Sequence, residues 1–146
     1  MVMSNKQDQV LVMDDEPELL EWLVEYLSVK GMEVTFAKDI AEGMSALEEG
    51  KYRFLVLDLN VPISGECRAM LSKNGELFLN FPGLYIAQSA RTKGYRDRQV
   101  IVYSVHDIDE VRAVTDRLRV TYVTKGRPRA FKAEIDDVLS FDPSEK

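Results

Sequence analysis

Short apolar runs that alternate with amphipathic segments restrict the fold of this chain more than any other feature. The runs are too short for helices and are interpreted as buried strands; they span residues 9–13, 32–37, 53–58, 99–104 and 120–124. The segment after each run has apolar residues at three-and-four spacing, typical of a helix with one core face. Leu19, Leu23 and Leu27 are the first example. Strand and helix therefore repeat five times.

This pattern predicts a doubly wound α/β fold, in which a five-stranded parallel sheet is covered by helices on both faces. Asp39 is predicted to cap the helix after residues 32–37. An insertion is expected at about 66–82, where Asn74-Gly75 and the alternating Leu77, Leu79 and Phe81 predict a hairpin between the third strand and its helix. We expect residues 1–146 to form one domain with its core at about 9–141.

Composition limits the environment and the partners. The net charge of −6 argues against direct binding of nucleic acid or anionic membranes. No apolar run approaches the roughly 20 residues that cross a bilayer, and no secretory signal precedes the first strand. Cys67 is the only cysteine and has no partner for an internal disulfide. A reducing, cytoplasmic location and protein partners are predicted.

Polar residues stand at the carboxyl ends of the predicted strands. Asp14 and Asp15 follow the first strand, Asp58 ends the third, Ser104 ends the fourth and Lys125 follows the fifth. In open parallel sheets ligands bind beyond the carboxyl ends of the strands. These five side chains are therefore expected to converge on one edge.

Three neighbouring carboxylates repel one another, and a divalent cation relieves that repulsion. Ligands that are all oxygen suit Mg²⁺ or Mn²⁺, and Mg²⁺ commonly shares its remaining positions with phosphate oxygens. Lys125 and the Ser104 hydroxyl supply a charge and a donor for phosphoryl oxygens. Because the chain has no Walker-type glycine loop, we predict that Asp58 is itself the nucleophile and forms an acyl phosphate.

With these residues in place, the chain resembles the receiver (CheY-like) domains of two-component response regulators. The resemblance rests on VLVMDDEPEL at the first strand, LVLDLNVP at the third, VIVYS at the fourth and YVTK at the fifth. It covers most of the chain apart from the central insertion, which makes this an atypical member. The flavodoxin-like fold of receivers agrees with the fold predicted above.

The resemblance implies a role for each matching residue. Asp58 matches the phosphoacceptor and Asn60 the residue whose backbone carbonyl binds the metal. Asp15 matches the acidic residue that contacts Mg²⁺ directly, and Asp14 its neighbour that acts mainly through water. Ser104 and Lys125 match the hydroxyl and basic residues that contact the phosphoryl group. Ser104 and Tyr122 match the two switch residues that move on activation.

It also implies a signalling switch rather than an enzyme with its own substrate, catalysing only its own phosphotransfer and dephosphorylation. A sensor histidine kinase or histidine phosphotransfer protein would donate the phosphoryl group, a downstream protein effector would read the changed surface, and the last helices are a candidate homodimer face. Three departures are Val105 after the serine, Gly126 after the lysine where receivers have a proline, and the early position of Gly65.

Two alternatives remain open from the sequence. A degenerate receiver would keep the fold and act as a phosphorylation-independent interaction module. A haloacid-dehalogenase-like phosphatase also uses an aspartate at a strand end, but it requires a second acid two residues later, where this chain has Asn60. The cognate kinase, the output and the extent of the full protein do not follow from these residues.

Overall fold

The computed structural model describes residues 8–105 and 108–140 of the chain. Its centre is a five-stranded, all-parallel sheet in the order β2-β1-β3-β4-β5. The strands are β1 (Gln9–Met13), β2 (Glu33–Ala37), β3 (Phe54–Asp58), β4 (Val100–Ser104) and β5 (Thr121–Thr124). The predicted doubly wound sheet is thus confirmed. The strand order reverses direction at β1, next to β3, which places the ligand-binding edge of such a sheet at their carboxyl ends.

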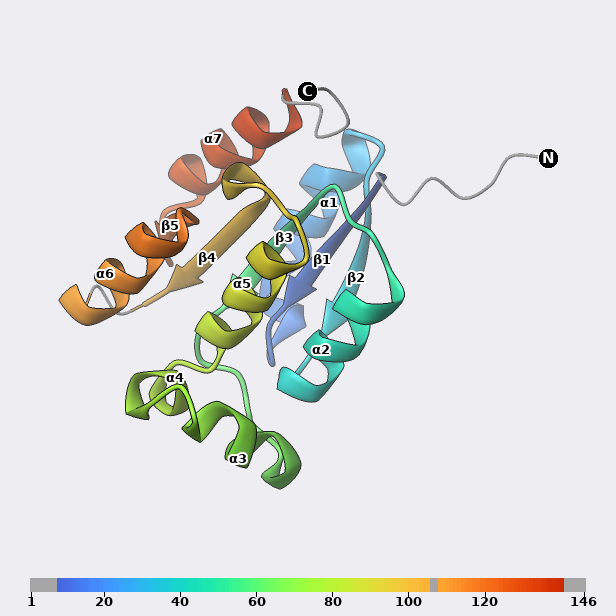
Figure 1. Ribbon diagram of the computed structural model, residues 1–146. Coiled ribbons are helices and arrows are strands. Elements are labelled where there is room, and N and C mark those ends of the chain that lie inside the picture. The colour runs from blue at the N-terminus through green and yellow to red at the C-terminus, as the bar shows by residue number, and fades with distance from the viewer. Residues whose placement is uncertain (1–7, 106–107, 141–146) are drawn as a thin grey trace.

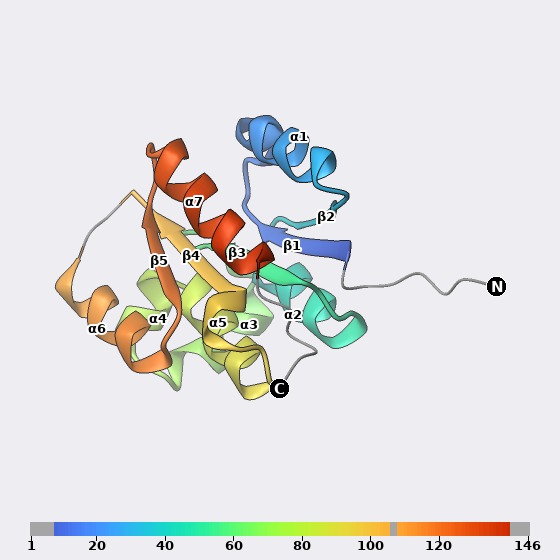
Figure 2. The same cartoon turned by 90° about the horizontal axis from the view of Figure 1, so that it is seen from above.

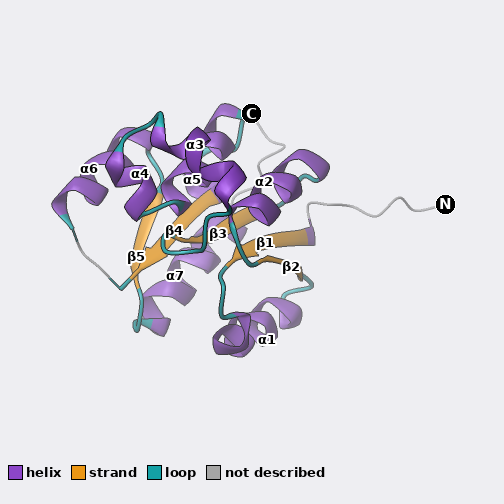
Figure 3. Ribbon diagram, turned by 90° about the horizontal axis from the view of Figure 1, so that it is seen from below, coloured by secondary structure: helices purple, strands orange, loops and turns teal. Residues whose placement is uncertain are grey.

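Helices cover both faces of this sheet (Figures 1 and 2). One face carries α1 (Glu21–Val29), preceded by the 3₁₀ turn η2 (Pro17–Leu20), and α7 (Pro128–Leu139). The other face carries α2 (Ile40–Glu49), α5 (Gly83–Thr92) and α6 (Asp109–Leu118), and the short η3 (Asp97–Gln99) leads into β4. Figure 3 shows the two helical layers on opposite sides of the strands.

Alternate strand residues build two separate apolar cores. Leu11, Leu55 and Val102 pack into the core under α2, α5 and α6. Val12 and Val56 face the core under α1 and α7. The central strands β1, β3 and β4 are buried almost throughout because helices cover both of their faces.

Local sequence signals account for several boundaries. Asp39 is the N-cap of α2, as predicted, and its carboxylate accepts the backbone N–H of Glu42 at 2.8 Å. The Glu42 carboxylate in turn accepts the backbone N–H of Lys38, the residue before the N-cap, at 2.9 Å, an arrangement close to a capping box. Within the described residues no helix is both apolar and long enough to span a bilayer.

The predicted hairpin at 66–82 is wrong. This segment forms two helices, α3 (Gly65–Ser72) and α4 (Glu76–Asn80), which lie at the carboxyl end of the strands beside α5 (Figure 1). Phe78 is buried, whereas a strand with Leu77 and Leu79 inward would expose it. Gly75 does adopt the left-handed backbone, with φ of +101°, but it reverses the chain between two helices instead of two strands.

Candidate functional site

Three carboxylates meet at the carboxyl edge of the sheet. Asp14 and Asp15 follow β1, Asp58 ends β3, and one carboxylate oxygen from each lies within 4.8 Å of the others. Asp14 and Asp58 are buried, whereas Asp15 is exposed. The predicted convergence of these three residues is what the structure shows, because parallel strands present their ends at one edge.

Lys125 is the cation that the fold itself places among these carboxylates. Its Nζ donates to Asp58 Oδ2 at 3.0 Å and lies 3.9 Å from Asp14 Oδ2. The other Asp58 oxygen, Oδ1, accepts the backbone N–H of Asn60 at 3.0 Å. Both oxygens of Asp58 are therefore oriented by donors from the loops after β3 and β5.

Burial opposes the charge on Asp58. The residue is 2% exposed, and this desolvation raises the pKa of its carboxyl group above the ordinary value. The Asn60 N–H and Lys125 act in the opposite direction and only partly offset the effect of burial on that pKa. Additional positive charge at this edge would therefore favour the carboxylate form, which is the nucleophilic one.

Tyr103 belongs to this site although the sequence analysis did not identify it. It is the next-to-last residue of β4, is 2% exposed and pairs in register with Asp58. Its hydroxyl donates a hydrogen bond to Asp14 Oδ2. Burial, followed by this hydrogen bond to Asp14, raises the pKa of the Tyr103 hydroxyl far above its usual value. The only signal in the sequence is one polar ring in an otherwise aliphatic strand.

Ser104 and Tyr122, the two predicted switch residues, lie in different surroundings. Ser104 ends β4 and is buried, and its backbone carbonyl accepts the N–H of Lys125 at 2.9 Å. Tyr122 lies in β5, half-buried against the core under α2, α5 and α6, with the Arg112 guanidinium 4.6 Å from its ring centre. The side chain of Val105 is 63% exposed at the point where the chain leaves β4.

Asn60 and Gly83 connect α4 and α5 to the loop after Asp58. The Asn60 side-chain amide donates to the backbone carbonyl of Asn80 at 3.2 Å. The Gly83 N–H donates to the Leu59 carbonyl at 3.0 Å. A Cβ atom on Gly83 would lie 2.3 Å from the Asp58 carbonyl oxygen, so only glycine permits this approach. Gly65, singled out from the sequence, has no atom within 4 Å of such a Cβ.

The loop after Lys125 uses a glycine where receivers have a proline. Gly126 has φ of +87°, in the left-handed region that residues with a Cβ rarely adopt. The chain then enters α7 at Pro128, the first residue of that helix. The departure noted in the sequence is thus a different way of turning the chain immediately after Lys125.

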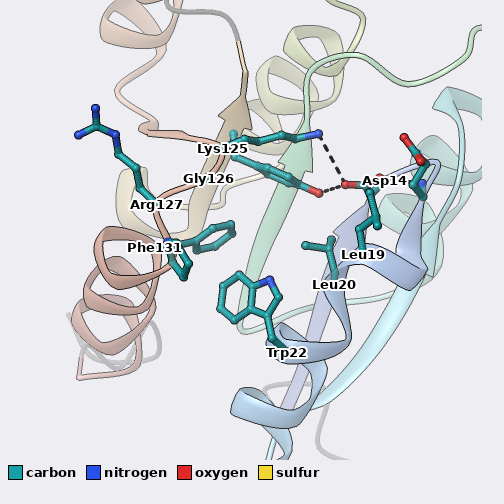
Figure 4. Close-up of a pocket in the computed structure, with 11 residues that line it drawn as sticks. Asp14, Leu19, Leu20, Trp22, Lys125, Gly126, Arg127 and Phe131 are labelled. Atoms are coloured by element: carbon teal, nitrogen blue, oxygen red, sulfur yellow. Dashed lines mark hydrogen bonds and ion pairs between the residues drawn. The ribbon is translucent and has the colours of Figure 1, made fainter.

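A pocket of about 200 Å³ adjoins the carboxylates on the α1 and α7 face. Figure 4 shows Trp22 and Phe131 on one side of it and Lys125 and Asp14 on the other. The Trp22 and Phe131 rings meet edge-to-face with centroids 5.5 Å apart. The lining is mainly apolar and ends at the charged edge of the sheet.

The donor set fits a hard divalent cation. Carboxylate oxygens from three residues are close enough to share one ion, and oxygen ligands of this kind suit Mg²⁺ or Mn²⁺. Lys125 supplies one positive charge to a cluster that carries three negative ones when ionised. The balance of charge therefore favours a further cation at this edge.

Comparison with solved structures defines the class of fold. The chain is similar to a response regulator receiver domain protein (CheY-like) from Methanospirillum hungatei, with a TM-score of 0.68 and 18% identity over 90% of this chain and 93% of that one. The fold is therefore the flavodoxin-like fold of response regulator receiver domains. No family model matches the sequence, and no curated protein matches it either.

Two further neighbours were solved with beryllofluoride. The response regulator TrrA from Thermotoga maritima, in complex with Mg²⁺ and BeF, has a TM-score of 0.65 and 25% identity over 90% of this chain and 98% of that one. The BeF₃-activated receiver domain of Klebsiella pneumoniae RstA has a TM-score of 0.68 and 15% identity, covering 91% and 99% of the two chains. The neighbours are receiver domains of signalling proteins.

Proposed function

We propose that this protein is a phosphorylation-dependent signalling switch that accepts a phosphoryl group on Asp58. The observation that carries the proposal is the group of Asp14, Asp15, Asp58 and Lys125 at the carboxyl edge of a receiver fold. Carboxylates that repel one another lower the stability of the folded chain, which argues that the site uses them. The Mg²⁺-BeF complex of TrrA supports the same chemistry in a protein of this fold.

The carboxylates at this edge have two roles, to hold the metal and to attack the phosphoryl group. Asp14, Asp15 and Asp58, with the backbone carbonyl of Asn60, would hold the metal, which supplies positive charge to phosphoryl oxygens when bound. Asp58 is the nucleophile: a carboxylate oxygen bonds to phosphorus while the phosphorus–nitrogen bond of a phosphohistidine breaks, and the imidazole leaves with its electron pair and takes up a proton.

Lys125 and Ser104 act on the transferred group. The Lys125 ammonium, now paired with Asp58, turns to a phosphoryl oxygen because the acyl phosphate carries more negative charge. The Ser104 hydroxyl donates to another phosphoryl oxygen, and Tyr122 repacks beneath α6 as the reporting side chain. Water later hydrolyses the acyl phosphate and restores the Asp58 carboxylate.

The partners follow from this chemistry. A sensor histidine kinase or histidine phosphotransfer protein would supply the phosphoryl group in the cytoplasm, and a protein effector or a second copy of the chain would bind the changed surface. The two helices α3 and α4 between β3 and α5 would give such a partner a contact surface next to the loop after Asp58.

Intact-mass analysis after incubation with acetyl phosphate tests the proposal. We expect a gain of one phosphoryl group that requires Mg²⁺, is abolished by EDTA and is absent in Asp58→Asn. If wild type gains no mass with Mg²⁺ while Mg²⁺ and beryllofluoride also leave its thermal unfolding unchanged, the site is inactive. The protein would then be the phosphorylation-independent interaction module.

A further inference from the structure

We infer that the Tyr103 hydroxyl competes with the hydrated divalent cation for the Asp14 carboxylate, and that Tyr103 thereby lowers the metal affinity of the site. This inference rests on the proposed function, because it concerns the same Mg²⁺ site. Tyr103 has no role among the predicted site residues, and it enters the site only through the contact of its hydroxyl with Asp14.

Each carboxylate oxygen of Asp14 already accepts a hydrogen bond from a protein donor. Its Oδ2 accepts the Tyr103 hydroxyl, and its Oδ1 accepts the backbone N–H of Glu16 at 2.7 Å. Asp14 is 4% exposed, so water compensates little of its charge. The hydroxyl therefore does for Asp14, in the absence of a metal, part of what a cation would do.

Packing fixes the Tyr103 hydroxyl in place. The ring is buried and lies against Phe131, with centroids 5.5 Å apart. Lys125 Nζ lies 4.8 Å from the centre of the same ring. A ring held by these neighbours cannot withdraw its hydroxyl at little cost, so the hydrogen bond to Asp14 persists in the metal-free protein.

The direction of the effect follows from these contacts. Removing the hydroxyl leaves a buried carboxylate with one donor fewer. This loss destabilises the metal-free protein more than the metal-bound protein. A bound cation compensates the same carboxylate and makes the missing donor less important. Mg²⁺ should therefore bind Tyr103→Phe more tightly than wild type, by about 3- to 10-fold.

Titration of the full chain with MgCl₂, followed by the emission of Trp22, measures this change. Trp22 is the only tryptophan of the sequence and lines the pocket together with Asp14 and Tyr103. Tyr26→Phe is a matched control: the Tyr26 hydroxyl also donates to an aspartate, Asp136, at 2.6 Å, but at an exposed position between α1 and α7. We expect tighter binding by Tyr103→Phe and wild-type affinity for Tyr26→Phe.

Equal or weaker Mg²⁺ binding by Tyr103→Phe, with wild type binding normally, would overturn the role of Tyr103 and leave the metal site intact. Absence of binding by all three proteins would overturn the metal site itself, and with it this inference. A second measurement needs no variant: in protein labelled at tyrosine ¹³Cζ, Mg²⁺ should shift the Tyr103 signal and leave that of Tyr26 unchanged. An unmoved Tyr103 signal in metal-bound protein contradicts the competition.

Discussion

Asp58, the proposed nucleophile, carries a charge that its surroundings disfavour. The residue is 2% exposed, and burial raises the pKa of its carboxyl group more than the Asn60 N–H and Lys125 lower it. The chain thus maintains the reactive carboxylate against a desolvation penalty. A bound cation would relieve this penalty.

Replacing Asp58 by asparagine should therefore stabilise the metal-free protein at neutral pH. Because the pKa of Asp58 is raised in the folded state, the group disfavours folding at pH values above its folded-state pKa. This unfavourable contribution disappears as the pH falls below the ordinary aspartate pKa of about 3.9. Urea denaturation in EDTA at pH 7 and near pH 4 should show a stabilised Asp58→Asn at pH 7 and a smaller difference near pH 4.

Asp136→Asn provides a control of opposite sign. The Tyr26 hydroxyl lowers the pKa of the exposed Asp136, so the contribution of Asp136 to stability is favourable above the ordinary aspartate pKa and is lost as the pH falls. A less stable Asp58→Asn at pH 7 would contradict the dominance of burial over the Lys125 ion pair.

At the scale of elements, α5 is seated directly on the end of β3. The backbone of Gly83, the first residue of α5, leaves no room for a side chain against Asp58 and Leu59. The neighbouring Asn60–Asn80 hydrogen bond joins the end of α4 to the same loop. Helices α4 and α5 therefore share one attachment point, which is the loop directly after Asp58.

Gly83→Ala should lower the free energy of unfolding by about 1–3 kcal/mol. The added Cβ would lie 2.3 Å from the Asp58 carbonyl oxygen and 2.7 Å from the Leu59 Cα, both backbone atoms that do not yield easily. Urea denaturation measures the change, and Gly65→Ala is the control because its Cβ would meet no atom within 4 Å. Equal effects of the two substitutions would show that the contact at Gly83 is unimportant.

Elements were predictable where their own residues carry the pattern. The five strands and the helices α1, α2, α6 and α7 each show a periodicity that is complete within the element, and Asp39 marks the start of α2 by its own side chain. The segment from Gly65 to Asn80 lacks that property. Its buried residues Leu71 and Phe78 are fixed by packing against the core under α5, which the local alternation of leucines does not encode.

At the scale of the whole molecule, the site lies between two apolar layers that do not mix. Tyr103 faces the core under α1 and α7, whereas Val102 faces the core under α2, α5 and α6. Parallel strands made the convergence of Asp14, Asp58 and Lys125 predictable. The register that pairs Asp58 with Tyr103 was not predictable, because it depends on how whole strands align.

Binding of Mg²⁺ and beryllofluoride should change amide hydrogen exchange in residues 63–82 as well as in α6. The Asn60 side chain ties the loop after Asp58 to Asn80 at the end of this segment, so a change at Asp58 should reach α4, and α3 packed against it, through this hydrogen bond. Hydrogen–deuterium exchange with mass spectrometry measures it. In Asn60→Ala the change in exchange of residues 63–82 should become smaller, whereas the change in α6 should remain. If binding leaves the exchange of residues 63–82 unaltered in wild type, the coupling is contradicted.

The turn at Asn74 and Gly75 has a practical consequence for protein engineering. Both residues are exposed, and a Cβ on Gly75 would meet no atom within 4 Å, yet the turn lies within the segment that is anchored beside Asp58. A circularly permuted fluorescent protein spliced between these two residues would keep clear of both cores. If Asp58 accepts a phosphoryl group as proposed, the emission of this fusion would change on phosphorylation and would report it inside a living cell.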